Sequence, residues 1–157
     1  MNRRSSFSVT AAGFFGIALG LSTAIAHAQD AKKSISTPDA PKAIGPYSQA
    51  IAVGKTVYLA GQVAIDPKTN QFMTDESIED QTRRALENLK AVLAADGLTM
   101  DDLASTTVFL KDMNDFGKMN EVYATYFKNA PPARATVEVA RLSRDMKIEI
   151  SGIAVRP

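Results

Sequence analysis

An alternation of apolar and polar residues predicts five β-strands in this chain. The side chains of a strand point to opposite faces in turn, so a half-buried strand repeats its pattern every two residues. The pattern makes Gly54-Lys55 the two-residue turn of a hairpin and residues 65–70, which include an Asp-Pro pair, a loop. The predicted strands are Tyr47–Val53, Thr56–Ala60, Ser105–Lys111, Ala133–Ala140 and Lys147–Val155.

Two other stretches repeat their apolar residues at helical spacing. The first is Ser77–Asp96, and Gly97 is placed to end it. The second runs from Asn114, whose side chain can cap a helix, to about Lys128. The apolar faces consist of Ile78, Thr82, Ala85, Leu86, Leu89, Val92 and Leu93 in the first helix and of Phe116, Met119, Tyr123, Tyr126 and Phe127 in the second.

The order β-β-α-β-α-β-β predicts an α+β fold, a two-layer sandwich in which both helices cover one face of a mixed sheet. The other face of the sheet still needs a cover. In the strand Ala133–Ala140, Val137 and Val139 alternate with polar residues, and neither face of the strand is plainly a solvent face. Polar residues on a half-buried sheet face suggest contact between subunits.

Residues 1–28 have the pattern of a secretory signal peptide. Arg3 and Arg4 provide a positive start, residues 9–26 carry no charge, and Ala26-His27-Ala28 offers small residues where a signal peptidase reads the chain. Cleavage is expected before Gln29, which would place the protein in the periplasm or outside the cell. A retained membrane anchor is the competing interpretation, and the arginine pair leaves the twin-arginine route open beside the general secretory route.

Residues 29–41 are polar and predict a flexible arm, and residues 42–157 follow as one domain. Removal of the signal peptide leaves 129 of the 157 residues, enough for a domain with its own core. Two of the 18 basic residues lie in the signal peptide, so 16 remain against 17 acidic residues. This balance gives no reason to expect binding to nucleic acid, or to a membrane once the signal peptide is removed.

The chain has no cysteine, and its one histidine, His27, lies in the predicted signal peptide. A mature protein without these residues cannot contain a Ser-His-Asp triad, a cysteine nucleophile or a zinc site built on His or Cys. Its chemistry must depend on Arg, Lys, Glu, Asp, Tyr, Ser, Thr, backbone groups or water.

Arg134 is the strongest candidate for binding a ligand. It follows a Pro-Pro pair at the start of a predicted strand, and Thr136 and Glu138 share its face. A guanidinium can donate two parallel hydrogen bonds to a carboxylate, which suits a small organic acid. The alternative is a structural arginine paired with Glu138 or Glu149.

Glu149 alternates with Ile148 and Ile150, so it points away from their apolar face. A partly buried glutamate with a raised pKa would suit a general acid or base, whereas a structural glutamate would pair with Lys147 or an arginine.

Three further residues have both a binding and a structural interpretation. Asn120 falls on the apolar stripe of its helix, where it could fix a backbone carbonyl or face a ligand. Tyr47 could close a pocket or belong to the core. Gly61 could let its backbone N–H approach a ligand or simply form a turn.

Five stretches together resemble the RidA/YjgF family of small trimeric imine deaminases, over the range from Ile44 to Arg156. Several ordered motifs at family-like spacing are far more specific than any one alone. The stretches are IGPYSQA (44–50), AGQVAIDPKT (60–69), TTVFLKDMNDF (106–116), PARATVEVARL (132–142) and KIEI (147–150).

The resemblance implies a chorismate-mutase-like fold and a homotrimer with clefts between its subunits. It implies that Arg134 binds the substrate carboxylate and that Glu149 works with the catalytic water. It also implies that Tyr47, Gly61 and Asn120 line the cleft.

Two residues depart from the pattern of many relatives. Thr136 stands where they have cysteine, which keeps a small side chain in the predicted substrate-binding site. Ala60 stands where they have serine, and the lost hydroxyl leaves the substrate range open.

The function implied is hydrolysis of 2-imino acids or their enamine tautomers, such as 2-aminoacrylate, to 2-oxo acids and ammonia. An imine carbon is already electrophilic, so the protein mainly positions groups and moves protons, and no metal or organic cofactor is required. The alternatives are a non-catalytic binder of small carboxylates, which would use Arg134 but not Glu149, and a chaperone-like role. A ribonuclease role, attached to some relatives, is disfavoured by the near-neutral charge and the missing histidine.

Overall fold

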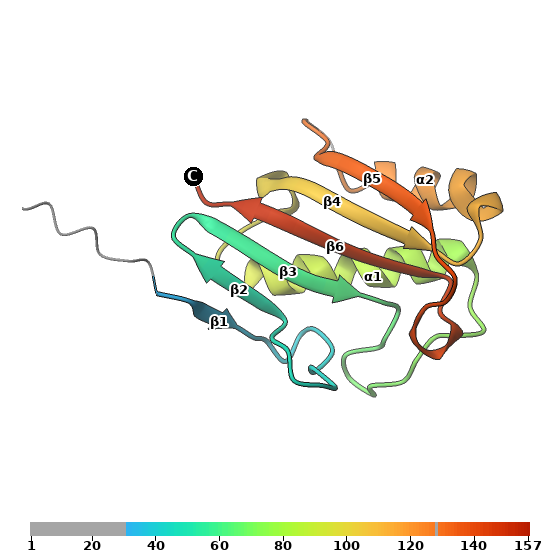
Figure 1. Cartoon of the computed structure of the whole chain (residues 1–157), viewed down its shortest axis with the longest axis horizontal. Helices are drawn as coiled ribbons and strands as arrows, with labels where there is room; N and C mark the ends of the chain where they lie inside the picture. The colour runs from blue at the N-terminus through green and yellow to red at the C-terminus, as the bar shows by residue number, and fades with distance from the viewer. Residues whose placement is uncertain (1–30, 128) are drawn as a thin grey trace, which may run out of the picture.

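The computed structural model describes residues 31–127 and 129–157, which form one six-stranded sheet with helices packed on it (Figure 1). The predicted signal peptide lies outside the described residues. Across the sheet the order is β1-β2-β3-β6-β4-β5, and β4 and β5 are parallel while all other neighbours are antiparallel. The strands are β1 (Lys33–Ile35), β2 (Ala50–Val53), β3 (Thr56–Gln62), β4 (Leu103–Leu110), β5 (Ala133–Glu138) and β6 (Ile148–Val155).

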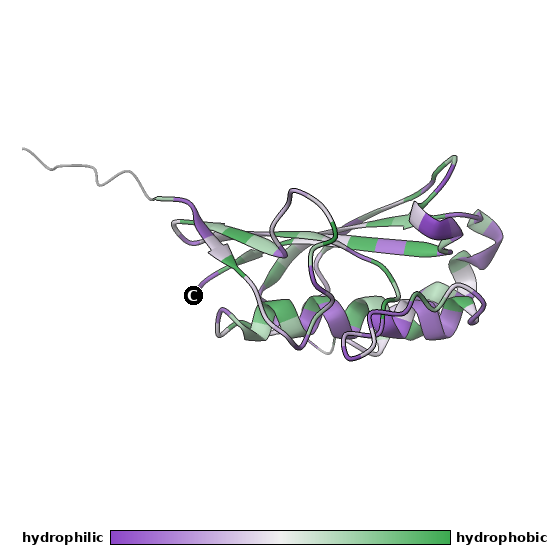
Figure 2. Ribbon diagram, turned by 90° about the horizontal axis from the view of Figure 1, so that it is seen from below, coloured by the Kyte–Doolittle hydropathy of each residue, from purple (hydrophilic) through white to green (hydrophobic). Residues whose placement is uncertain are grey.

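Both helices, α1 (Ile78–Ala94) and α2 (Phe116–Ala124), lie on the same face of the sheet (Figure 2). Every residue of the predicted apolar face of α1 is buried. The helix begins where the Ser77 hydroxyl accepts a hydrogen bond from the Asp80 backbone, and Gly97 follows its end with a φ of +75°. The predicted α+β sandwich is therefore confirmed. In the part of the chain that the structure describes, no helix is long and apolar enough to cross a membrane.

The predicted flexible arm is partly ordered. Residues 33–35 form β1, which pairs antiparallel with β2. The buried side chain of Gln49 holds the segment that follows, because its amide donates hydrogen bonds to the carbonyls of Thr37, Ala40 and Pro41 at 3.1, 3.2 and 2.7 Å. The prediction was wrong here because a three-residue edge strand is held by backbone pairing, which leaves little trace in its side chains.

The start of the second helix also differs from the prediction. Asn114 does not cap the helix: the side chain that caps is that of Asp112, at the start of a 3₁₀ turn, where its carboxylate accepts a hydrogen bond of 2.8 Å from the Asn114 backbone. The 3₁₀ turn is Met113–Asp115, and α2 begins only at Phe116. Asp and Asn cap helices about equally well, so the sequence alone could not choose between them.

The face of the sheet opposite the helices, which we call the open face, carries exposed apolar side chains. No helix covers it within the described residues (Figure 2). The alternation of each strand directs one set of side chains to the helices and the other set to this face. The exposed apolar side chains are Val53, Tyr58, Val137, Ile153 and Val155, with 36–50% of their surface accessible.

Candidate active site

Arg134 lies on the edge strand β5, where its side chain points toward α2. One guanidinium nitrogen, Nη2, donates a hydrogen bond of 2.8 Å to Oδ1 of Asn120. Its Cζ lies 4.5 Å from the centroid of the Tyr123 ring and 5.7 Å from that of Phe116, distances typical of cation–π contacts. These contacts come from one side of α2 at helical spacing, and they fix the guanidinium at the edge of the sheet.

Arg134 forms no ion pair within the described part of the chain. The structural alternative, a pair with Glu138 or Glu149, is not realised. Glu138 instead accepts a hydrogen bond of 2.8 Å from the Met113 backbone. The remaining donors of the guanidinium are therefore available for an anion.

Asn120 and Thr136 lie beside Arg134. Among the described residues, Asn120 donates to no backbone carbonyl; its amide oxygen instead accepts a hydrogen bond from the guanidinium and orients it. Thr136 is two residues along the same strand and on the same face, and its Oγ1 is buried with no hydrogen-bond partner in the part of the chain that the structure describes. A buried hydroxyl without a partner costs free energy, and a ligand group that reached this atom would offset that cost.

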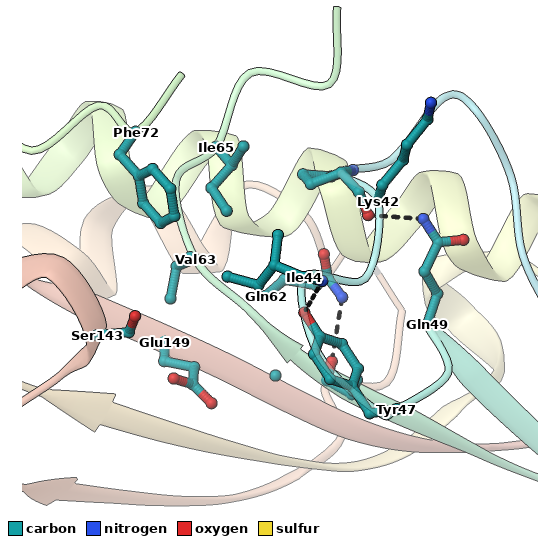
Figure 3. A pocket seen from close by; sticks show the side chains of 13 residues that line it. Lys42, Ile44, Tyr47, Gln49, Gln62, Val63, Ile65, Phe72, Ser143 and Glu149 are labelled. Atoms are coloured by element: carbon teal, nitrogen blue, oxygen red, sulfur yellow. Dashed lines mark hydrogen bonds between the residues drawn. The ribbon is translucent and has the colours of Figure 1, made fainter. Parts of the chain in front are cut away.

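Glu149 lines a pocket of about 370 Å³ on the other side of the sheet (Figure 3). The pocket lies between the end of β3, the segment before β2, the loop after β3 and the turn before β6. Tyr47 and Gly61, both predicted from the sequence, line it as well, and Figure 3 shows Tyr47 and Glu149 facing each other across it. The other lining residues are Pro41, Lys42, Ile44, Gln49, Ala60, Gln62, Val63, Ile65, Phe72 and Ser143.

Gly61 allows Glu149 to lie against the backbone of β3. A β-bulge interrupts the pairing of β3 and β6 between Leu59 and Gln62 and leaves Gly61 opposite the carboxylate. A Cβ at Gly61 would lie 2.0 Å from Oε1 of Glu149, which is far inside van der Waals contact. The glycine is therefore required by the position of the Glu149 side chain.

Burial raises the pKa of Glu149 above its usual range, and burial is the only cause of this shift. Within the described residues the carboxylate forms no ion pair that would compensate its lost hydration. A carboxyl group that holds its proton more tightly in this way is suited to exchange protons with a substrate.

Arg134 and Glu149 lie on opposite faces of the sheet. Arg134 is paired with Thr106 of β4, whose hydroxyl lies 2.6 Å from that of Tyr123 on the helix face. Glu149 is paired with Phe109 of β4 and alternates with the buried Ile148 and Ile150, so it points to the open face. One chain therefore holds its predicted anion anchor and its predicted acid apart, separated by the sheet itself.

Some residues of both regions were not singled out in the sequence. Tyr123 and Phe116 were assigned to the core, although their spacing with Asn120 places all three on one side of α2. Burial raises the pKa of Tyr123, partly offset by Thr106 and Arg134, so its ring is a neutral support for the guanidinium. Phe72 and Ser143 of the pocket come from loops, where no periodic pattern could have indicated them.

Comparison with known proteins assigns the chain to a family. The family model described as Endoribonuclease L-PSP matches residues 37–156. A 2-iminobutanoate/2-iminopropanoate deaminase of Salmonella typhimurium is 50% identical over 127 residues, which cover 79% of this chain and 98% of that protein.

Two solved structures from E. coli have the same fold. The YjgF gene product is 44% identical, with a TM-score of 0.76 over 80% of this chain and 99% of its own. TdcF, with bound serine, is similar to the same extent: 44% identity and a TM-score of 0.76 over 80% and 99% of the two chains. With this coverage and identity, the chain belongs to the RidA/YjgF family.

Proposed function

We propose that the protein hydrolyses 2-imino acids, or their enamine tautomers, to 2-oxo acids and ammonia. The observation that carries the proposal is that the chain has both an oriented guanidinium, at Arg134, and a desolvated carboxyl group, at Glu149. The deaminase name of the Salmonella typhimurium relative supports the same reaction. The bound serine in TdcF supports a ligand with an α-carboxylate.

The site is formed between copies of the chain, in a homotrimer. Arg134 and Glu149 cannot act on one small molecule within one chain, because they lie on opposite faces of the sheet. The apolar side chains of the open face give a second copy a surface to bury. A neighbouring β5 edge placed over the pocket would bring its Arg134 to the Glu149 of the first copy.

In this arrangement Arg134 binds the substrate carboxylate with two parallel hydrogen bonds. Glu149 of the neighbouring copy holds a water molecule beside the C=N carbon. As the water oxygen attacks the carbon, its proton passes to Glu149 and then to the nitrogen, which gives a carbinolamine. In the collapse of this intermediate the hydroxyl proton passes through Glu149 to the nitrogen, the C=O bond forms, the C–N bond breaks, and ammonia leaves. An enamine substrate first becomes the imine by taking a proton on its β-carbon and losing one from its nitrogen.

The test is the release of 2-oxo acid and ammonia from imines that an amino-acid oxidase generates in situ. Arg134→Ala is expected to raise KM about 10- to 150-fold, because a charged hydrogen bond contributes about 1.5–3 kcal/mol. Arg83→Ala, which removes an exposed arginine of α1, is the matched control and keeps the wild-type rate. If Arg134→Ala keeps it too, the proposal is wrong.

A non-catalytic binder of small carboxylates is the second candidate, and the bound serine of TdcF is the observation that favours it. Such a protein would depend on Arg134 and not on Glu149. Glu149→Gln separates the two functions, because an enzyme loses turnover and keeps its affinity for pyruvate. A binder has no turnover to lose, in either the wild type or the variant.

Export to the periplasm or the medium belongs to the same proposal and rests on residues 1–28 of the sequence alone. The mass of the protein recovered from an export-competent bacterium tests it. A chain that starts at Gln29 is expected, and a full-length chain found in the cytosol would contradict export.

A further inference from the structure

The pocket beside Glu149 has an apolar lobe that hydrolysis of a C=N bond does not itself require. Three of the lining side chains, Val63, Ile65 and Phe72, lie together on one side of the pocket, away from Tyr47 (Figure 3). We call these three residues the apolar lobe. Its presence means that a ligand held next to Glu149 has an apolar surface within the same cavity.

The apolar lobe is fixed by contacts with the helix α1, within the loop itself and with Arg144. The buried Asn88 of α1 donates hydrogen bonds to the backbone carbonyls of Val63 and Ile65 at 3.1 and 2.9 Å. A β-bridge joins Ile65 to Phe72. The guanidinium of Arg144 lies 5.6 Å from the Phe72 ring centroid. A surface held in this way is preformed, so that little ordering cost offsets the binding of an apolar group.

The charges around the pocket favour uncharged side chains. Among its lining residues within the described chain, only Lys42 and Glu149 are charged, and in the proposed reaction Glu149 holds the attacking water. A cationic side chain of a substrate would lose hydration against the apolar lobe without gaining a partner there. An anionic side chain would lose hydration too, because Arg144, the cation that contacts Phe72, is not among the residues that line this pocket.

We infer that the apolar lobe receives the side chain of the substrate, and that the protein prefers 2-imino acids with large aliphatic side chains. This inference rests on the proposed function, because it requires the reacting carbon to lie next to Glu149. Each methylene that the lobe buries is expected to raise kcat/KM about fourfold. The imine derived from leucine should therefore exceed the imine derived from alanine at least about tenfold.

The experiment compares kcat/KM for these two imines, each generated by an amino-acid oxidase, in the wild type and in three variants. Phe72→Asn makes the lobe polar, and Phe72→Leu is its matched apolar control. Val63→Thr keeps the shape of the side chain and adds a hydroxyl, so it serves if the Phe72 variants fold poorly. The leucine-to-alanine ratio should fall toward one in Phe72→Asn, fall several-fold in Val63→Thr, and persist in Phe72→Leu.

The outcomes distinguish this inference from the proposed function. Acceleration of both imines with no preference for the leucine-derived one overturns the inference and leaves the proposed function intact. A preference that survives in folded Phe72→Asn and Val63→Thr also overturns it, since the side chain then lies elsewhere. If the wild type accelerates neither imine, the inference and the proposed function fall together.

Discussion

The β5 edge around Arg134 and the pocket around Glu149 hold their charged groups in opposite ways. At the edge, side chains position the charged group: an amide and two aromatic rings of α2 orient a guanidinium that stays half-exposed. In the pocket, the backbone positions the charged group, because a β-bulge at Gly61 lets the carboxyl group of Glu149 lie against β3. The first arrangement leaves the positive charge of Arg134 accessible to an anion. The second raises the free energy of the ionised form of Glu149.

Neither region is therefore a complete site by itself. An exposed guanidinium at an edge can bind an anion but has no group beside it to move protons. A desolvated carboxyl in a pocket can move protons, but it forms no ion pair within the described residues, and the pocket lining offers the single ammonium group of Lys42 in place of an oriented guanidinium. The two regions complement each other only if a second copy of the chain brings them together.

Mixing two inactive variants tests most directly whether the two regions meet between copies of the chain. Arg134→Ala retains the pocket and Glu149→Gln retains the edge, so a site between two copies can be intact only when one chain of each kind forms it. Random mixing in a closed ring should make about one site in four intact. We expect the co-refolded mixture to recover about a quarter of the wild-type turnover, measured as ammonia release.

Each variant refolded alone is the control for this experiment and should remain at the background rate. Native mass spectrometry on variants of different mass, one of them carrying a tag, verifies that mixed oligomers form. Mixed oligomers without recovered activity would place both groups in the same copy and contradict a site between copies.

The two regions also differ in how far the sequence predicts them. The strands and α1 follow clear periodic patterns, and the predicted apolar face of α1 is buried, as are Ile148 and Ile150 of β6. Arg134 and Glu149 were identified from their strands and motifs. Their placement on opposite faces was not, because it depends on how β5 and β6 each align with β4, and this long-range register is not written in either strand alone.

The walls of the pocket were the least predictable part. Phe72 and Ser143 reach it from a loop and a turn whose paths depend on distant contacts. Buried amides hold some of these loops by their backbone carbonyls, as Asn88 does for Val63 and Ile65. Such bonds do not depend on the identity of the loop side chain, so the loop sequence carries no signal for them.

Gly61→Ala should impair the pocket and leave the edge unchanged. The added Cβ would fall 2.0 Å from Oε1 and 2.7 Å from Cδ of Glu149, so the carboxyl group must move away from β3. Because the displaced atoms are the flexible end of a side chain, the fold should persist while kcat falls on the order of a hundredfold, as for loss of a general acid or base. Kinetics and thermal unfolding measure the two effects.

Gly117→Ala is the matched control for Gly61→Ala. A Cβ at this α2 position meets nothing within 4 Å. The substitution should stabilise the helix by up to about 1 kcal/mol and leave kcat at the wild-type value. Equal losses of kcat in both variants would mean that the close approach at Gly61 has no part in the reaction.

The pH dependence of stability should reveal the cost of the buried carboxyl group. Burial raises the pKa of Glu149 above its ordinary value of 4.5, so the folded state binds its proton more tightly than the unfolded state. The stability that this proton contributes is present below pH 4.5 and is lost as the pH rises through the raised pKa. Relative to the Glu149→Gln counterpart, stability should therefore fall with rising pH over this window.

This measurement is cleanest in the Arg134→Ala background, because the guanidinium of a neighbouring copy would lower the pKa of Glu149. Urea unfolding of Arg134→Ala and of Arg134→Ala/Glu149→Gln at several pH values gives the slope. A slope of opposite sign in this background would show that another cation reaches the carboxyl group, and that the pocket is not the uncompensated site described above.

Thr136→Val is expected to have the smallest effect, and it tests whether the edge is built for a ligand. The Oγ1 atom of Thr136 is buried without a partner, so the folded protein bears the cost of its lost hydration. Valine keeps the shape and removes this cost, and the free energy of unfolding should rise by about 1 kcal/mol. If the hydroxyl contacts the substrate beside Arg134, KM should rise at the same time.

A gain in stability with a loss of affinity in Thr136→Val would mean that the fold keeps an unfavourable buried hydroxyl because the hydroxyl binds the substrate. A loss of stability in Thr136→Val would instead show that the hydroxyl has a structural hydrogen-bond partner in solution. The threonine would then be explained by the folding of the β5 edge and not by ligand binding.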